Sequence, residues 1–464
     1  MNERQWMLPA ALGIGGPELI AIVGGGGKTS LMFALAATLP GRVVVTTTTR
    51  IFAAQMRLAP AVVYADDLAP LGPLLEQHGR CLVVGHVDGD KARGVDPDLP
   101  ARLLARPDVD FVVVEADGSR LRPVKAPAGH EPVIPPQTTL VVSVAGLDAL
   151  EGPLDEVAHR PERVRALLAE APAGESLTAG DTLTPAGLAR LLAHPQGGLK
   201  SLPDEARAVM WLNKVEGSRR LEWGRAAAGL MLREPRVSRV VLGEARSAAP
   251  VREVTRRVTA VVLAAGESRR MGTNKLLLPW GHTTVLGQTL ANVGAAAVHN
   301  VLLVTGHERE RVEAMVASEG DGHSGKSGMS LDRQLPMLHN HDYANGMLTS
   351  VQTAVRALPP SAEAILIMLG DQPLVATDTL DSLLRAYAAT PAGLVAPIYD
   401  GRRGNPVIID RRYFDELLAL PVGAAPRVLL ARHAGDLLAV EVEDAAVLID
   451  LDRPEEYASR RPAR

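Results

Sequence analysis

Continuous apolar runs recur along the whole chain and fall into two groups. The first group contains LIAIV, RVVVTTTT, CLVV, FVVVEA, TLVVSVAG, AVMWL and RVVLG, and the second VTAVVLAAG, NVLLVTG, AILIML, GLVAP, NPVIID and AVLID. Most runs do not alternate with polar residues, which is typical of strands buried on both faces of a parallel sheet. Helix-like segments such as LMFALAATL and TLDSLLRAYAA separate many of them. The pattern predicts an α/β fold with right-handed crossovers.

A polar, basic stretch, EARSAAPVREVTRR at 244–257, interrupts this pattern near the middle of the chain. A new apolar run and a new glycine-containing loop follow it directly. Because 464 residues suffice for two or three domains, we predict one α/β domain at 1–250 and a second at 257–464. A further polar stretch, EGDGHSGKSGMS at 319–330, is expected to be a surface loop of the second domain.

Composition narrows the class of protein without identifying its chemistry. The chain is 47% hydrophobic and 22% charged, as globular proteins are, and its net charge of −4 gives no general attraction to nucleic acid. The single cysteine, Cys81, lies in an apolar run and is expected to be a buried hydrophobe. The chain has no signal-peptide pattern and no run of the roughly 18–20 apolar residues that span a membrane, so we expect a cytoplasmic protein with no membrane or nucleic-acid partner.

The first glycine-rich loop is AIVGGGGKTS at 21–30. Glycine lets backbone N–H groups approach oxygen atoms, a helix start adds partial positive charge and the lysine adds a full one, so the order of residues predicts phosphate binding. The hydroxyl after the lysine is where a P-loop binds Mg²⁺, although the consensus has a further glycine where Ile22 stands. The candidate residues are Gly25, Gly26, Gly27, Lys28, Thr29 and Ser30.

Two later stretches carry polar groups that suit the same site. FVVVEADGSR places Glu115 and Asp117 at the end of a predicted strand, where carboxylates can hold Mg²⁺ or a water molecule. AVMWLNKVE ends in NKVE at 213–216, which resembles the guanine-reading Asn-Lys-x-Asp of GTPases with Glu in place of Asp. Asn213 is therefore a candidate site residue, and a solvated loop is the alternative interpretation.

The first half as a whole resembles a known family. EADGSRLRPVKAPAGHEPVIP, together with VVSVAGLDAL, HRPE at 159–162 and GGGGKTS, is similar to the YqeC family of accessory proteins for selenium-dependent molybdenum hydroxylases. The resemblance implies a P-loop-like, three-layer α/β domain that acts in the maturation of such enzymes. It supplies a context and not a reaction.

The second loop, VVLAAGESRRMGTNKLLLPW, resembles the L-A-A-G-x-S-x-R-M-G-x-x-K-L-L signature of nucleotidyltransferases. These enzymes direct a substrate phosphate at the α-phosphorus of a nucleoside triphosphate, and catalysis is mostly positioning and electrostatic stabilisation. We expect backbone N–H groups near Gly266, with Arg270 and Lys275, to hold the triphosphate. Arg269 either joins them or faces solvent.

Three carboxylates are candidate Mg²⁺ ligands. Asp371 directly follows the apolar run AILIMLG, and Asp450 and Asp452 lie in VLIDLD near the end of the chain. Carboxylates from separate strands, together with triphosphate oxygens, satisfy the octahedral oxygen coordination of Mg²⁺. A strand-end cap is the alternative for Asp450 alone.

LAAG, GDQPL, GRRGNPVIID and DLDRPEEY together resemble the molybdenum cofactor cytidylyltransferases of the MocA type over about 258–460. The resemblance implies a Rossmann-like nucleotide-diphospho-sugar transferase fold, with Mg²⁺ as cofactor and with CTP and the molybdenum cofactor as substrates. Guanylyltransferase relatives read L-A-G-G, so Ala265 favours CTP. The implied nucleotide-binding residues are Ala264, Ala265, Gly266, Ser268, Arg270, Gly272, Lys275, Ser350, Gly370 and Asp371, of which Arg270, Lys275 and Asp371 are catalytic.

The side expected to bind the pterin departs from the family pattern. Asn405 stands where many members have histidine, and PVGAAPR at 421–427 keeps only Gly423 and Arg427 of the expected segment. Arg402, Arg403 and Arg427 are either partners of an anionic pterin or solvated surface charges. HNHD at 339–342 has no third ligand placed by the sequence, so we do not predict zinc there.

The sequence therefore predicts a nucleotidyltransferase that transfers CMP from CTP to the molybdopterin phosphate and releases pyrophosphate. The fused first domain is expected to serve hydroxylase maturation, with a transient complex between this protein and a molybdenum hydroxylase. Three alternatives remain: a nucleotidyltransferase that uses GTP or a sugar phosphate, a cofactor-insertion chaperone switched by nucleotides, and a GTPase based on the first domain.

Overall fold

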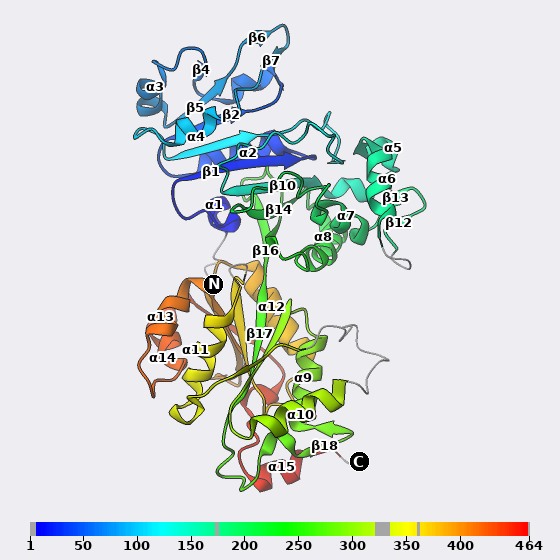
Figure 1. Cartoon of the computed structure of the whole chain (residues 1–464), viewed down its shortest axis with the longest axis vertical. Coiled ribbons are helices and arrows are strands. Elements are labelled where there is room, and N and C mark those ends of the chain that lie inside the picture. Colours follow the sequence, from blue (N-terminus) through cyan, green and yellow to red (C-terminus); the bar gives the residue numbers. More distant parts are fainter. Residues whose placement is uncertain (1–5, 172–175, 321–334, 360–361, 463–464) are drawn as a thin grey trace. The chain divides into compact units, whose positions relative to one another are not determined.

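The computed structural model describes residues 6–171, 176–320, 335–359 and 362–462 (Figure 1). The chain divides into two compact units, Met1–Thr255 and Arg256–Arg464, each of which is described by itself. The polar stretch at 244–257 is more than a linker, because its second half forms strand β16 (Val251–Arg256) at the edge of the first sheet. The expected surface loop at 319–330 lies, apart from its first two residues, outside the described residues.

The first unit is built on a sheet of nine strands within the described residues. In spatial order they are β16, β15 (Val237–Gly243), β14 (Arg207–Asn213), β10 (Leu140–Gly146), β1 (Glu18–Gly24), β8 (Phe111–Glu115), β2 (Val43–Thr47), β5 (Arg80–Val84) and β4 (Val62–Tyr64). All pairings from β15 to β4 are parallel, as the continuous apolar runs predicted. Short ladders join β3 (Ile51–Phe52), β7 (Lys91–Ala92) and β6 (Val87–Asp88), β9 (Val124–Lys125) and β11 (Ala158–His159), and β12 (Thr178–Ala179) and β13 (Thr182–Leu183).

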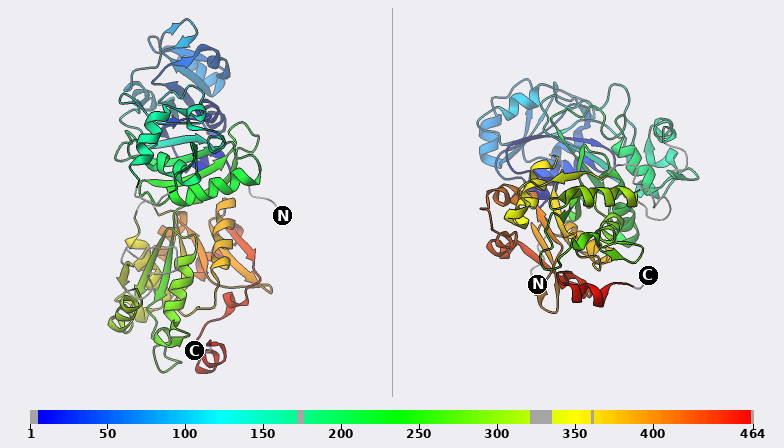
Figure 2. Two further views of the ribbon diagram at one scale, coloured as in Figure 1. Left: turned by 90° about the vertical axis from the view of Figure 1, so that its right-hand side faces the viewer. Right: turned by 60° about the horizontal axis from the view of Figure 1, so that its bottom comes forward.

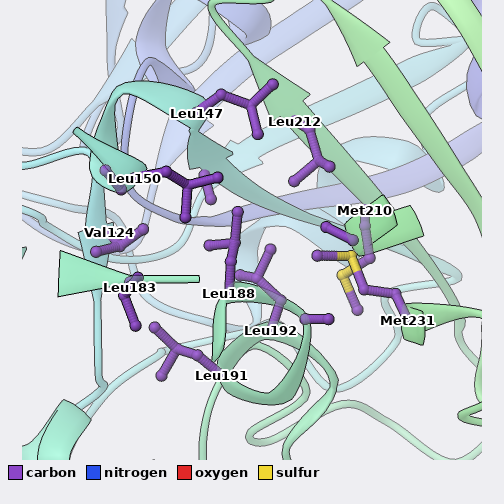
Figure 3. Close-up of a cluster of buried hydrophobic side chains, with 14 of the residues drawn as sticks. Val124, Leu147, Leu150, Leu183, Leu188, Leu191, Leu192, Met210, Leu212 and Met231 are labelled. Atoms are coloured by element: carbon purple, nitrogen blue, oxygen red, sulfur yellow. The ribbon is translucent and has the colours of Figure 1, made fainter. Parts of the chain in front are cut away.

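Helices cover both faces of this sheet and complete three layers (Figures 1 and 2). Ile20 and Ile22 of β1 pack in one apolar core with α1 (Leu8–Leu12) and α2 (Lys28–Thr38). Leu19, on the opposite face, packs with α3 (Leu71–His78) and α4 (Leu99–Leu104). Met210 and Leu212 of β14 pack on that second face with α6 (Pro161–Ala169), α7 (Pro185–Ala193) and α8 (Gly217–Met231), as Figure 3 shows in part, and α5 (Leu154–Val157) lies beside them.

The second unit contains a mixed sheet. Its order is β21 (Met337–His339), β20 (Asn300–Thr305), β17 (Val258–Ala264), β22 (Ala364–Leu369), β25 (Val407–Asp410), β23 (Leu394–Tyr399) and β24 (Arg402–Arg403), and β26 (Leu437–Glu441) also pairs with β23. The strands from β21 to β22 are parallel, whereas β25 is antiparallel to both of its neighbours. The run NPVIID is therefore a buried strand, but its direction differs from the parallel arrangement that its apolar pattern predicted.

Helices again lie on both faces of the sheet. One core contains side chains of α9 (Val285–Ala295), α10 (Arg309–Gly320) and α12 (Thr377–Ala389), and the other those of α11 (Met347–Ala357), α13 (Phe414–Ala419) and α14 (Arg427–Arg432). The last helix is α15 (Pro454–Arg460), and a short hairpin pairs β18 (Pro279–Trp280) with β19 (Thr283–Thr284). Among the described residues, no helix combines the length and the apolar character that crossing a bilayer requires.

The prediction of a strand at AVLID was wrong. Ala445–Leu448 forms a 3₁₀ turn, because the Asp444 carboxylate accepts the backbone N–H of Ala446 at 2.9 Å and caps the turn. Asp450 and Asp452 therefore follow a turn and lie in a loop rather than at the end of a sheet strand.

A buried ion pair anchors the start of the second unit. One guanidinium nitrogen of Arg256 lies 2.6 Å from Asp410 Oδ2, which also accepts the Tyr387 hydroxyl at 2.7 Å. The guanidinium carbon lies 3.4 Å from the centre of the Tyr387 ring. Burial raises the pKa of the Asp410 carboxyl, but Arg256 and Arg412 outweigh it, so that pKa lies below its ordinary value.

We expect Asp410→Asn to lower the free energy of unfolding by about 3–5 kcal/mol at neutral pH, because the Arg256 charge would stay buried without its partner. The pKa of Asp410 is depressed in the folded state. Its contribution is therefore present above the ordinary carboxyl pKa and lost as the pH falls through the folded-state value. Urea unfolding at several pH values measures this, with Asp400→Asn at an exposed turn as the control. Equal stability of both variants at neutral pH would contradict the expectation.

Candidate nucleotide sites

A cleft of about 520 Å³ lies in the second unit, where the parallel strands end. The loop after β17 forms one wall, and the loop after β22, the start of α11 and the segment 450–452 form the rest. The predicted residues that line it are Ala265, Gly266, Ser268, Arg270, Lys275, Ser350, Asp371, Asp450 and Asp452. The structure thus brings together residues that lie almost two hundred positions apart in the sequence.

The loop after β17 presents its backbone to this cleft. Ser268 has a positive φ of 52°, and its hydroxyl accepts the backbone N–H of Lys275 at 3.2 Å. The amide N–H groups of Gly266 to Arg270 have no acceptor within the described part of the chain. An anion is the chemical partner that a loop with several unsatisfied N–H donors favours.

Lys275 lies between two carboxylates. Its ammonium group donates to Asp371 and, at 2.6 Å, to Asp452 Oδ1. Burial lowers the pKa of Lys275, but the two aspartates outweigh it and raise that pKa above the ordinary value. The hydrogen bond from Lys275 in turn lowers the pKa of Asp452, whose second oxygen lies 3.1 Å from a guanidinium nitrogen of Arg270.

Asp450 is the third carboxylate of the cleft. Gln372, which the sequence analysis did not single out, donates to Asp450 Oδ1 at 2.9 Å. Burial raises the pKa of Asp450, and the negative charges of Asp371 and Asp452 raise it further. Crowded, mutually repelling carboxylate oxygens suit a divalent cation. No three acidic, histidine or cysteine side chains among the described residues are arranged to hold a metal ion, so phosphate oxygens or water would complete a Mg²⁺ site.

Other predicted residues shape the cleft without lining it. Ala264 is the buried end of β17, Gly272 has a positive φ of 67°, and a Cβ at Gly370 would lie 2.8 Å from the Leu263 carbonyl oxygen. These three residues are not among those that line the cleft, and their part in nucleotide binding stays a prediction.

Asn340 is a residue whose role the sequence analysis missed. It is buried, and its side-chain amide donates to the hydroxyls of Thr349 at 2.8 Å and Ser350 at 2.9 Å, which fixes the start of α11. Asn340 lies within the HNHD motif, between two histidines whose ring centroids are 4.3 Å apart.

Three arginines that were either pterin partners or solvated charges are not among the residues that line the cleft. Arg402, Arg403 and Arg427 are exposed and do not line it, and the Asn405 backbone N–H donates to the Val447 carbonyl at 2.9 Å. The reading of these arginines as solvated charges agrees with this arrangement.

The first unit has a larger pocket, of about 1160 Å³. Of the predicted loop residues, Gly26, Gly27, Lys28, Thr29 and Ser30 line it, as do Glu115 and Asn213. Lys28 is buried, and its ammonium lies 3.3 Å from Asp117 Oδ1 and 3.6 Å from Glu115 Oε1. Burial lowers the pKa of Lys28, but the two carboxylates raise it more.

The structure gives Gly25 and Gly26 a different role from the one expected. Their N–H groups donate to the carbonyls of Val144 and Arg122, so they do not point at a phosphate. A Cβ at Gly26 would lie 2.3 Å from the Gly146 nitrogen, and one at Gly25 would lie 2.6 Å from the Arg122 oxygen. These glycines allow close approach of neighbouring backbones.

Asn213 connects two loops of the pocket. Its buried side-chain amide donates to the Gly26 carbonyl at 2.7 Å and accepts the Ala245 N–H at 3.0 Å. Lys214, next along the chain, has a positive φ of 63° and lies 2.5 Å from Asp148 Oδ2. The NKVE segment is thus an ordered wall of the pocket, not only a solvated loop.

The segments KAPAGHEPVIP and HRPE, to which the sequence assigned no role, form an ion-pair chain. Lys125 is buried and lies 2.9 Å from Asp117 Oδ2 and 2.7 Å from Glu131 Oε2, and Arg160 lies 2.9 Å from the same Glu131 oxygen. Burial opposes ionisation of Glu131, but the hydrogen bonds from Lys125 and Arg160 lower its pKa to about 2.

Comparison with known proteins agrees with this division into two units. The model of the YqeC protein family matches residues 20–162, and that of the MobA-like NTP transferase domain matches residues 260–437. The chain is 35% identical to protein YqeC of Escherichia coli (strain K12) over 43% of this chain and 76% of that protein. It is 28% identical to the molybdenum cofactor cytidylyltransferase of the same organism, over 44% of this chain and 95% of that enzyme. It is 30% identical to a probable molybdenum cofactor guanylyltransferase of Mycobacterium marinum, over 42% of this chain and 89% of that protein.

The fold and cleft of the second unit are those of a nucleotidyltransferase domain. The chain belongs to the YqeC family through its first unit and to the MobA-like NTP transferase family through its second.

We expect Glu131→Gln to lower the free energy of unfolding by about 3 kcal/mol at pH 7, the value that corresponds to a carboxyl pKa of about 2 in place of 4.5. Because the folded-state pKa is depressed, this contribution is present above pH 4.5 and is lost as the pH falls toward 2. Urea unfolding across this pH range measures it, with Glu76→Gln on the exposed side of α3 as the control. A difference between wild type and variant that did not shrink in acid would contradict this role of Glu131.

Proposed function

We propose that the second unit is a Mg²⁺-dependent cytidylyltransferase that transfers CMP from CTP to the phosphate of the molybdenum cofactor. The observation that carries the proposal is Lys275 held between Asp371 and Asp452, beside a loop with free amide donors. Two of the relatives, named as a cytidylyltransferase and a probable guanylyltransferase of the molybdenum cofactor, support the choice of acceptor.

The chain's own residues bind and neutralise the triphosphate. The amides of Gly266 to Arg270 donate to phosphate oxygens, and Arg270 and Lys275 balance the charge that builds on the α-phosphate and on the leaving group. Bound Mg²⁺ would add charge neutralisation between the carboxylates Asp371 and Asp450 and the phosphates. A phosphate oxygen of the cofactor forms the new bond to the α-phosphorus, and the bond to the β-phosphate breaks, which releases pyrophosphate.

Ala265 supports CTP as the donor. Its side chain is buried against the loop after β20, since a Cβ added at Gly306 would lie 2.7 Å from the Ala265 Cβ. The methyl group therefore occupies space at the wall of the cleft and cannot move aside. Such a wall favours the smaller pyrimidine ring over a purine.

The first unit, in this proposal, serves the maturation of the hydroxylases that receive the cofactor, through a transient complex with them. Fusion in one chain keeps the two activities at a high effective concentration. This role, like the cytoplasmic location expected from the sequence, stays a prediction.

We expect Asp371→Asn to lower the rate of pyrophosphate release at least about a hundredfold, because one charge that positions the metal and Lys275 is removed. The assay uses full-length protein, Mg²⁺, molybdenum cofactor and CTP, and Asp415→Asn on the exposed first turn of α13 is the control. Unchanged release in the Asp371 variant would refute the assignment. No release by the wild-type protein with any nucleotide would favour the cofactor-insertion chaperone instead.

We expect Ala265→Gly to raise the ratio of kcat/KM for GTP to kcat/KM for CTP about tenfold, because removal of a methyl group makes room for a larger base. The measurement is pyrophosphate release with each nucleotide in turn. A wild-type protein that prefers GTP, or a ratio that does not move, would show that this side chain does not select the base.

A further inference from the structure

The pocket of the first unit is more than twice as large as the cleft of the second and has its own lysine, hydroxyl and carboxylates. We propose that this pocket binds a nucleoside triphosphate with Mg²⁺, so that the chain carries a second, separate nucleotide site. The site lies wholly in the first unit and does not depend on the function proposed for the second.

The phosphate end of the site is the start of α2. The amide N–H groups of Gly27, Lys28, Thr29 and Ser30 have no acceptor among the described residues, in contrast to those of Gly25 and Gly26. Four free donors at the positive end of an eleven-residue helix form an anion site. The adjacent Lys28 supplies a full positive charge.

A hydroxyl and a carboxylate stand beside these donors. The Thr29 hydroxyl donates to Glu115 Oε2 at 2.8 Å, and Glu115 ends β8, the strand next to β1 in the sheet. A hydroxyl and a carboxylate oxygen together with phosphate oxygens suit Mg²⁺.

The sheet order places the loops of the pocket on two sides of β1. The loops after β14 and β15 lie on one side of β1, and those after β8 and β2 lie on the other. The second side presents the cationic Arg50 after β2 and Arg120 after β8. The first side presents Asn213, Glu216 and Glu244, and also the cationic Lys214 and Arg246. Carboxylates accept hydrogen bonds, and guanine offers adjacent N–H donors that adenine lacks, so Glu216 and Glu244 favour guanine over adenine.

Backbone strain is concentrated around the same pocket. Eight non-glycine residues of the described chain have positive φ, and four of them line it, namely Arg120, Leu121, Arg160 and Lys214. Such strain is typical of segments that hold ligands.

Hydrogen exchange of the full-length protein tests the proposal, because it reads each unit separately. With Mg²⁺ and the β,γ-imido analogue of GTP, we expect amide exchange in a peptide covering 24–31 to slow at least tenfold, and less with the ATP analogue. A peptide covering 264–276, measured with a non-reacting CTP analogue, reports on the second unit independently. Slowing with the ATP analogue alone would overturn the guanine assignment, and no slowing with either would overturn the site.

Two matched substitutions on α2 separate binding from folding. Thr29→Val keeps the shape of the side chain but removes the hydroxyl. We therefore expect the affinity for the ligand with Mg²⁺, measured from the slowing of exchange, to fall at least tenfold. Thr38→Val, at the exposed far end of the same helix, is expected to change nothing. An equal effect of both variants, or slowing that EDTA does not reduce, would refute the metal-assisted site.

Discussion

In each unit, a lysine ammonium lies between two acidic side chains at the edge of a sheet where parallel strands end. Lys28 meets Glu115 and Asp117, and Lys275 meets Asp371 and Asp452. Such an arrangement is stable only because the positive charge offsets two partly desolvated negative ones. It also holds the two carboxylates of each pair close together, where a divalent cation could take the place of the lysine ammonium.

Only those parts of the two sites that depend on local residue order could be predicted from the sequence. Strand–glycine–lysine order predicted both loops, and continuous apolar runs predicted the parallel strands on which they lie. The ion-pair chain through Lys125, Glu131 and Arg160 could not be predicted, because its members are brought together only by loops that cross between strands. The sequence held no periodic pattern that would place them.

Local hydrogen bonding and strand direction account for the errors in the second unit. An apolar run alone does not distinguish a strand from a 3₁₀ turn, and the Asp444 cap decided the matter for AVLID. Nor does it distinguish a parallel from an antiparallel strand, as β25 shows. At Gly25 and Gly26 the sequence predicted phosphate binding, but glycine is needed there because neighbouring backbones approach closely.

The reversed direction of β25 affects the position of the acidic segment 450–452. Because β25 enters the sheet where β22 leaves it, the residues just before β25 lie at the edge that carries the cleft. There Asn405 binds the Val447 carbonyl, and a Cβ at Gly404 would lie 2.3 Å from that same oxygen. The backbone at Gly404 thus packs directly against the Val447 carbonyl, close in sequence to Asp450 and Asp452. Any side chain at position 404 would therefore force the backbone at Val447, just before the segment that bears Asp450 and Asp452, to move.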